Sequence, residues 1–219
     1  MSFNSRKIFT SVIAAIAWFA LALQLYIMLK NGAAAGIRAS ASVVNFFSFF
    51  TILSNIFVAV CLTVVVLTPF SIPGIFCSKT TVQSSIALNI FIVGLVYNLV
   101  LRNIWSPKGW QLVADNLLHV VVPVLYVLYW YFFTPKKQLT QRDIFPWLLF
   151  PALYLGYSLV RGAVTGWYPY PFIHSDNLGY GKVARNSLMV LLAFVIAGLG
   201  LIALNRMSKK TGAKKVKRT

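Results

Sequence analysis

Six apolar segments, each about 20 residues long or longer, occupy most of this chain. A helix needs about 20 apolar residues to cross the hydrocarbon core of a bilayer. The 219 residues are 59% hydrophobic and only 11% charged, a composition typical of membrane proteins and unlike that of a soluble domain. The sequence therefore predicts an all-α fold, a polytopic membrane bundle of six transmembrane helices. The expected spans are residues 8–29, 43–68, 83–104, 112–133, 145–164 and 183–204.

The links between these segments contain the Pro, Gly and Asn residues that end helices. A single transmembrane domain is expected over residues 1–204, followed by a basic tail at 205–219. The first apolar segment is too long for a typical signal peptide and lacks a clean cleavage site, so we expect it to be retained as a helix.

Basic residues are distributed unequally between the two ends of the predicted spans. With both termini inside, 13 of the 20 Lys and Arg residues lie on the inner side and 7 on the outer side. The positive-inside rule then predicts cytoplasmic termini. The tail is expected to lie along anionic lipid headgroups, and the compact six-span design favours a bacterial inner membrane.

The charged residues also exclude several classes of function. The net charge is +17, but the basic residues flank apolar spans and no nucleic-acid-binding motif is present, so nucleic acid is not an expected partner. The chain has no Glu, and its three Asp residues, Asp115, Asp143 and Asp176, lie in different segments, which argues against a paired-carboxylate site. Cys61 and Cys77 show no metal-ligand spacing. No metal or organic cofactor is expected.

The sequence FFSFFTILSN, residues 46–55, places polar side chains inside the longest uncharged run. Ser48, Thr51 and Asn55 are three and four residues apart and would share one face of a helix. Polar groups in hydrocarbon are costly unless they find partners, so this face is expected to point into the bundle. Thr51 alone is weak support for catalysis, because a membrane Thr usually bonds its own helix, but a nearby base would make it a nucleophile.

His119 is the candidate base. It lies in the fourth predicted span, with Asp115 and Asn116 four and three residues before it on the same helical face. Imidazole exchanges protons near neutral pH, and ionisable groups inside membrane spans are usually functional or paired. The alternative is a His that only packs the bundle through a hydrogen bond to a backbone carbonyl or an Asn.

The predicted topology places several of these polar groups at one depth. Thr51 and His119 are eight and seven residues from the outer ends of their spans, roughly 10–12 Å at 1.5 Å per residue. Arg102 and Arg161 fall near the outer ends of two other spans, with Asn98 one turn from Arg102. Either Arg is a snorkelling anchor or a partner for a substrate carboxylate or phosphate. The common depth predicts one shared polar pocket.

Three sequence patterns resemble a known family. FFTILSN at 49–55, NLLHVVVP at 116–123 and the RG…GWYPYPF pattern at 161–172 are similar to the bacterial six-pass branch of the androgen-induced-gene-like membrane proteins. The patterns lie in three spans and so cover most of the chain. The resemblance implies an intramembrane threonine hydrolase acting on fatty acid esters of hydroxy fatty acids. Carried over by motif, Thr51 is its nucleophile and His119 its base.

The expected function is therefore an integral-membrane lipid ester hydrolase. Asn55, Asn98 or Asn116 would donate a hydrogen bond to the developing oxyanion, and Arg102 or Arg161 would hold a free carboxylate of the substrate. Membrane lipids are the expected partners. The alternative is a non-enzymatic multi-pass protein, either a small-solute transporter or a lipid-binding protein. A continuous polar path would favour transport, and a closed outer pocket would favour the hydrolase.

Overall fold

The computed structural model describes residues 3–207, and this part of the chain is helical with no strand. Its last twelve residues, most of the predicted basic tail, lie outside the described residues. The helices are α1 (Phe3–Ala34), α2 (Ala39–Phe47), α3 (Phe50–Leu67), α4 (Ile72–Cys77), α5 (Thr80–Val96), α6 (Gly109–Asn116), α7 (Val122–Phe133), α8 (Ile144–Thr165), α9 (Ser175–Leu178) and α10 (Tyr180–Met207). Short π-helical segments, Tyr97–Leu101 and Leu117–Val121, follow α5 and join α6 to α7.

Within residues 3–207, six helical stretches are long and apolar enough to cross a membrane. They are Asn4–Ala34, Phe50–Leu67, Thr80–Leu101, Gly109–Phe133, Gln141–Thr165 and Tyr180–Met207. The all-α, six-span fold class is therefore confirmed, and the chain is an integral multi-pass membrane protein. The second span is shorter than the expected 43–68, because α2 and α3 are separate helices.

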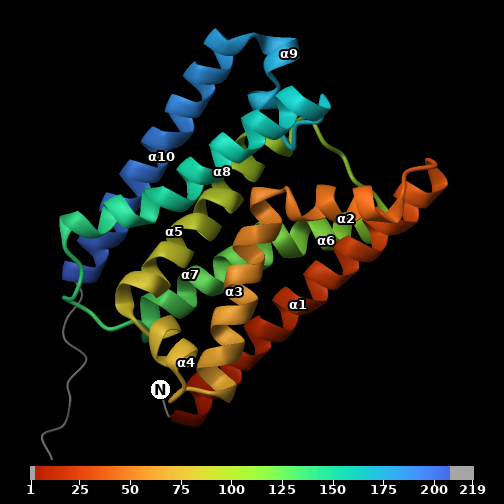
Figure 1. The fold of residues 1–219 in the computed structure, drawn as a ribbon. Helices are drawn as coiled ribbons and strands as arrows, with labels where there is room; N and C mark the ends of the chain where they lie inside the picture. Colours follow the sequence, from red (N-terminus) through yellow and green to blue (C-terminus); the bar gives the residue numbers. More distant parts are fainter. Residues whose placement is uncertain (1–2, 208–219) are drawn as a thin grey trace, which may run out of the picture.

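Helices α3 and α5 form the centre of the molecule, with α1 on one flank and the pair α8 and α10 on the other (Figure 1). Half of the apolar window of α3 and of α5 is buried, against 17% for α8 and 22% for α10. The outer surfaces of α8 and α10 are thus left for lipid. Helix α10 packs mainly on α5, while α8 contacts α5 only lightly, which leaves space between this flank and the centre.

The end of α10 is tied to the link between α7 and α8. Asn205 is fully buried, its carboxamide oxygen accepts from the Gln138 and Leu139 amides, and its nitrogen donates to the Pro135 carbonyl at 2.8 Å. The Arg6 guanidinium lies 5.7 Å from the Phe133 ring centroid at the same end of the bundle. The starts of α1 and α8 and the end of α10 therefore lie at one end, as six crossings require.

Candidate functional site

A break between α2 and α3 shapes the site. Phe49 has an extended backbone, φ −87° and ψ 130°, although neither Pro nor Gly stands nearby. The break is held by tyrosines of α8: the Tyr154 hydroxyl donates to the Ser48 carbonyl at 2.9 Å, and the Tyr157 hydroxyl lies 2.7 Å from Ser48 Oγ. The Tyr154 contact pairs the Ser48 carbonyl, which in a continuous helix would accept from a backbone N–H. Ser48 therefore faces α8 and does not share a helical face with Thr51 and Asn55 as expected.

The break also places Thr51 in the first turn of α3. The backbone N–H groups of a first turn have no acceptor within their own helix. The Thr51 N–H instead donates to the Tyr170 hydroxyl at 3.2 Å. This is the positive end of the helix dipole, so negative charge that develops next to Thr51 is stabilised there.

The Thr51 hydroxyl contacts a histidine and a tyrosine from distant parts of the chain. Thr51 Oγ1 lies 3.2 Å from His119 Nε2 and 3.2 Å from the Tyr170 hydroxyl. Only 6% of Thr51 is exposed. The two residues that the sequence singled out as nucleophile and base are thus in direct contact.

The surroundings of His119 select its tautomer. His119 Nδ1 lies 2.9 Å from the Asp115 carbonyl, which can only accept, so Nδ1 carries the proton and Nε2 is free to accept from Thr51. The Asp115 carboxylate is 3.4 Å from the same nitrogen and accepts a hydrogen bond from the Tyr97 hydroxyl. The Tyr97 ring stacks on the imidazole at 4.2 Å with a 17° interplanar angle. The imidazole is held on two sides and can be stabilised if it becomes charged.

The end of α5 and the segment that contains His119 both widen into π-helical turns. His119 lies in the segment Leu117–Val121, just before Pro123, whose missing N–H leaves the His119 carbonyl without its usual helical donor. Gly94 of α5 packs directly against this turn: a Cβ there would be 3.2 Å from the His119 carbonyl oxygen. The absence of a side chain at Gly94 lets α5 approach the His119 turn.

The Asn55 side chain holds the Thr51 backbone through hydrogen bonds. Its side-chain nitrogen donates to the Thr51 carbonyl at 2.8 Å and to the Leu118 carbonyl at 3.2 Å. Asn55 is fully buried, and its side-chain oxygen has no partner. It therefore joins α3 to the turn that contains His119.

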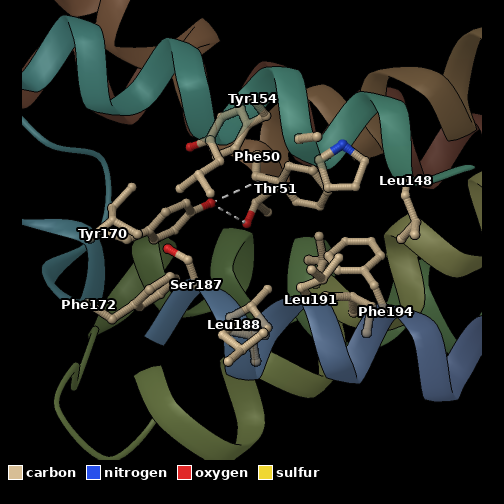
Figure 2. A pocket seen from close by; sticks show the side chains of 18 of the residues that line it. Phe50, Thr51, Leu148, Tyr154, Tyr170, Phe172, Ser187, Leu188, Leu191 and Phe194 are labelled. Carbon is tan, nitrogen blue, oxygen red and sulfur yellow. Dashed lines mark hydrogen bonds between the residues drawn. The ribbon is translucent and has the colours of Figure 1, made fainter. Parts of the chain in front are cut away.

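Two cavities meet at the Thr51–Tyr170 contact. The apolar cavity, about 420 Å³, lies between α3, α5, α8 and α10 and is lined by hydrophobic residues such as Phe50, Leu191 and Phe194. Figure 2 shows Thr51 and Tyr170 joined at one end of this cavity, with residues of α10 along one side.

The second cavity, called here the His119 cavity, is about 430 Å³ and is lined by His119, Asp115, Gln24 and Gln111, with Met28 among its apolar residues. Thr51, Tyr170 and Leu101 line both cavities. The Thr51 hydroxyl therefore stands between an apolar chamber and a more polar one, each comparable in size to a small-ligand site.

The segment 166–174 covers the site, and Gly162 is the reason that it docks closely. Gly166 ends α8 in the left-handed region at φ 70°, which favours glycine. Tyr168 then folds back on α8 so that a Cβ at Gly162 would lie 1.9 Å from its ring. Trp167 and Tyr170 both pack edge-on against Phe49. Burial raises the pKa of Tyr170, and hydrogen bonds from Thr51 oppose this shift only in part.

The other predicted contact residues lie elsewhere. Arg102 is exposed and donates to Asn98 at 3.2 Å. Arg161 donates to Asn45 at 2.6 Å and stacks over Trp167 at 4.2 Å. Asn116 is half-buried next to the His119 turn. The residues lining the two cavities do not include Asn55, Asn98, Asn116, Arg102 or Arg161. Of the predicted set, the structure brings together Thr51 and His119 at the cavities, with Asn55 bonded to the Thr51 carbonyl behind them.

Three residues of the site were not assigned a role from the sequence. Asp115 is signalled only by its spacing of four residues before His119. Tyr97 and Tyr170 carry no local signal, because their contacts join segments far apart in the chain.

No family model matches this chain, and neither curated proteins nor solved structures match it significantly. The geometry of Thr51, His119 and their neighbours is therefore the main support for a function.

Proposed function

We propose that this protein is an integral-membrane lipid ester hydrolase in which Thr51 is the nucleophile and His119 the general base. One observation carries the proposal: Thr51 Oγ1 lies 3.2 Å from His119 Nε2, while Nδ1 bonds to the Asp115 carbonyl. A nucleophile, a base and a group that orients the base define the arrangement used in hydroxyl-based acyl transfer.

The residues present support each proton transfer. His119 Nε2 takes the proton of Thr51 as Oγ1 attacks the ester carbonyl carbon, and the Asp115 carboxylate faces the imidazolium that forms. The alcohol then leaves with that proton. Water, activated in turn by His119, releases the acid from Thr51 and restores the hydroxyl.

The two cavities support a substrate that extends on both sides of Thr51. A long acyl chain suits the apolar cavity, and an alcohol portion with polar groups suits the His119 cavity. The resemblance to the androgen-induced-gene-like family favours fatty acid esters of hydroxy fatty acids, whose two halves both carry chains. Such substrates would come from the surrounding membrane lipids.

The topology belongs to the same proposal. The excess of Lys and Arg on the side of the termini supports cytoplasmic termini, and Thr51 would then lie near the outer face. A bacterial inner membrane is the proposed location.

Lipid binding without catalysis is the second candidate, and the apolar cavity favours it. Transport has less support. In the half of the bundle away from Thr51, Gln83 bonds to Tyr129 and Thr134, and Ser84 accepts from Trp130 at 2.7 Å. These buried groups use each other as partners and offer no free polar lining for a solute.

The test compares purified wild type with Thr51→Val, Thr51→Ser and His119→Ala on a panel of long-chain acyl esters. Thr51→Val removes the hydroxyl at nearly constant volume, and we expect kcat/KM to fall by more than about 10³-fold, with a similar loss for His119→Ala. Thr51→Ser keeps a hydroxyl and should retain measurable turnover.

Thr63→Val is the matched control, because Thr63 lies on the same helix and bonds only to the Ala59 carbonyl and Trp18. It should behave as wild type. A folded wild type that hydrolyses none of the esters, or a fully active Thr51→Val, would overturn the hydrolase proposal and leave lipid binding.

A further inference from the structure

We infer that Tyr170 is a further catalytic residue: its phenol and the Thr51 backbone N–H together bind the ester carbonyl oxygen as that oxygen becomes negative. This inference rests on the proposed hydrolase function and adds to it a residue outside the Thr51–His119 pair. Tyr170 belongs to the covering segment 166–174, so the same inference gives that segment a part in the reaction.

The position of the Tyr170 phenol is the first support. Its oxygen lies 3.2 Å from Thr51 Oγ1 and 3.2 Å from Thr51 N, the two atoms between which an ester carbonyl must sit during attack. The N–H···O contact is at the long end of the usual range of about 2.7–3.2 Å, and the O···O contact is beyond about 3.0 Å, so little is lost when a substrate oxygen replaces them. The phenol then turns its O–H toward that oxygen.

The Thr51 N–H supplies the second donor. It is in the first turn of α3, so it is not used within the helix, and Tyr170 is the partner it has in the structure. A nucleophile's own amide is well placed for this task, because it points to the side from which the carbonyl approaches. The helix dipole adds a favourable potential at the same place.

The asparagines that were expected to be donors are committed elsewhere. The Asn55 nitrogen donates to two backbone carbonyls, and the Asn98 nitrogen donates to the Gly94 carbonyl at 2.8 Å on an exposed face. Asn116 is absent from the lining of both cavities. Tyr170 is the neutral donor that lines both cavities and touches Thr51.

The environment keeps Tyr170 protonated, as a donor must be. Burial raises the pKa of its phenol. The titratable groups around it are Tyr154 of α8, and His119 with Asp115 on the far side of Thr51. Hydrogen bonds from Thr51 favour the phenolate but offset the effect of burial only in part.

The bonds balance without an added reactant. Thr51 Oγ1 forms a bond to the carbonyl carbon, the C=O π pair moves to the carbonyl oxygen, and the Thr51 proton goes to His119 Nε2. Tyr170 and the Thr51 N–H only donate hydrogen bonds to the new oxyanion. The C–O bond to the alcohol then breaks, the C=O reforms, and the alcohol leaves with the proton of His119.

The test measures hydrolysis of 4-methylumbelliferyl oleate and inhibition by oleyl trifluoromethyl ketone, which forms a tetrahedral adduct with a hydroxyl nucleophile. We expect Tyr170→Phe to lower kcat by about 10²- to 10³-fold with KM changed less than about 3-fold, the loss found when one oxyanion donor is removed. The inhibition constant of the ketone should rise by a similar factor. Tyr131→Phe, which removes an exposed phenol of α7 that lines neither cavity, is the matched control and should match wild type.

The outcomes separate the two proposals. Active wild type, inactive Thr51→Val and Tyr170→Phe with kcat within about 3-fold of wild type would overturn the role of Tyr170 and leave the hydrolase standing. A rise in KM alone would overturn it too, because it would assign Tyr170 to ground-state binding. An inactive wild type would overturn both.

A second variant avoids the risk that Tyr170→Phe fails to fold. Replacing Tyr170 with 3,5-difluorotyrosine keeps its shape and lowers the pKa of the phenol. A hydrogen-bond donor acts only while it is protonated. The alkaline limb of the kcat–pH profile should therefore lie at lower pH in the fluorinated variant than in wild type. A profile that coincides with wild type would contradict the role, since a purely structural tyrosine would not move it.

Discussion

A threonine hydroxyl becomes reactive only when its surroundings take its proton and stabilise the charge that follows. At Thr51 these requirements are met by separate parts of the chain: His119 offers an unprotonated nitrogen, and the start of α3 offers a backbone N–H and a favourable dipole. The low dielectric of the bundle strengthens each of these interactions. Thr51 thus depends on the start of its own helix and on the turn that contains His119.

The role of the Asp115 carboxylate can be tested at the residue scale. The Asp115→Asn variant keeps the backbone carbonyl that sets the His119 tautomer but removes the charge that faces the imidazolium. We expect kcat to fall clearly, but by much less than the ~10⁴-fold seen where the orienting carboxylate also sets the tautomer. Steady-state kinetics with Tyr97→Phe, which removes only the hydrogen bond to Asp115, provide the comparison. An unchanged kcat in Asp115→Asn would contradict the role of the carboxylate.

At the residue level the sequence predicted the Thr51–His119 pair but not its neighbours. Thr51 and His119 were linked by their equal depth, which is a property of span position and can be counted along the chain. Tyr170 could not be found in this way, because its contact depends on how a loop folds back over α3. The roles expected of Arg102 and Arg161 depended on side-chain direction, and depth alone does not predict that direction.

At the level of elements, the covering segment is positioned by one glycine of α8, Gly162. The ring of Tyr168 occupies the space above Gly162, and this contact brings Tyr170 to Thr51. The pattern of Arg161-Gly162 followed by an aromatic, proline-rich segment therefore has a packing explanation. The segment and the helix break meet at Phe49, so both are needed to form the site.

Gly162→Ala tests this docking. The added Cβ would lie 1.9 Å from the Tyr168 ring, so the segment must move, and we expect a loss of about 1–3 kcal/mol in stability together with reduced turnover. Thermal unfolding in detergent and ester hydrolysis measure the two effects.

Gly156→Ala on the same helix is the control, because a Cβ there meets nothing within 4 Å. It should be neutral or slightly stabilising, since Ala is the better helix former. Equal behaviour of the two variants would contradict the docking role of Gly162.

The helix break is the element that the sequence did not predict. Residues 43–68 read as one continuous apolar span, because no Pro or Gly interrupts them at Ser48 or Phe49. The break is stabilised by Tyr154 and Tyr157 from α8, about 100 residues further along the chain. Local helix propensity depends on neighbouring residues and so does not reflect contacts with a distant helix. The ends of the other spans, in contrast, are marked by their own turn residues.

At the scale of the whole molecule, the six spans were predictable because span length and apolar content are sequence properties. Their packing was not. The light contact between α8 and α5, which leaves room for the apolar cavity, follows from side-chain volumes at many contacts. This arrangement is what would let one chain of an ester lie between helices while the other half faces His119.

Chain-length preference tests that orientation. Leu191→Trp adds bulk to the apolar cavity, and we expect turnover of long acyl chains to fall more than turnover of short ones. Leu192→Trp, at an exposed neighbouring position outside the cavity lining, should leave the preference unchanged. Hydrolysis rates over a series of acyl lengths give the measurement. A loss that is equal at every length would contradict the placement of the acyl chain.

The most direct test of the central claim is to locate the covalent adduct. Purified wild type would be treated with a fluorophosphonate bearing a long alkyl chain, digested and examined by mass spectrometry. We expect the phosphonyl group on Thr51, and no adduct in Thr51→Val or His119→Ala. An adduct on another residue, or labelling that persists in Thr51→Val, would contradict a Thr51 nucleophile.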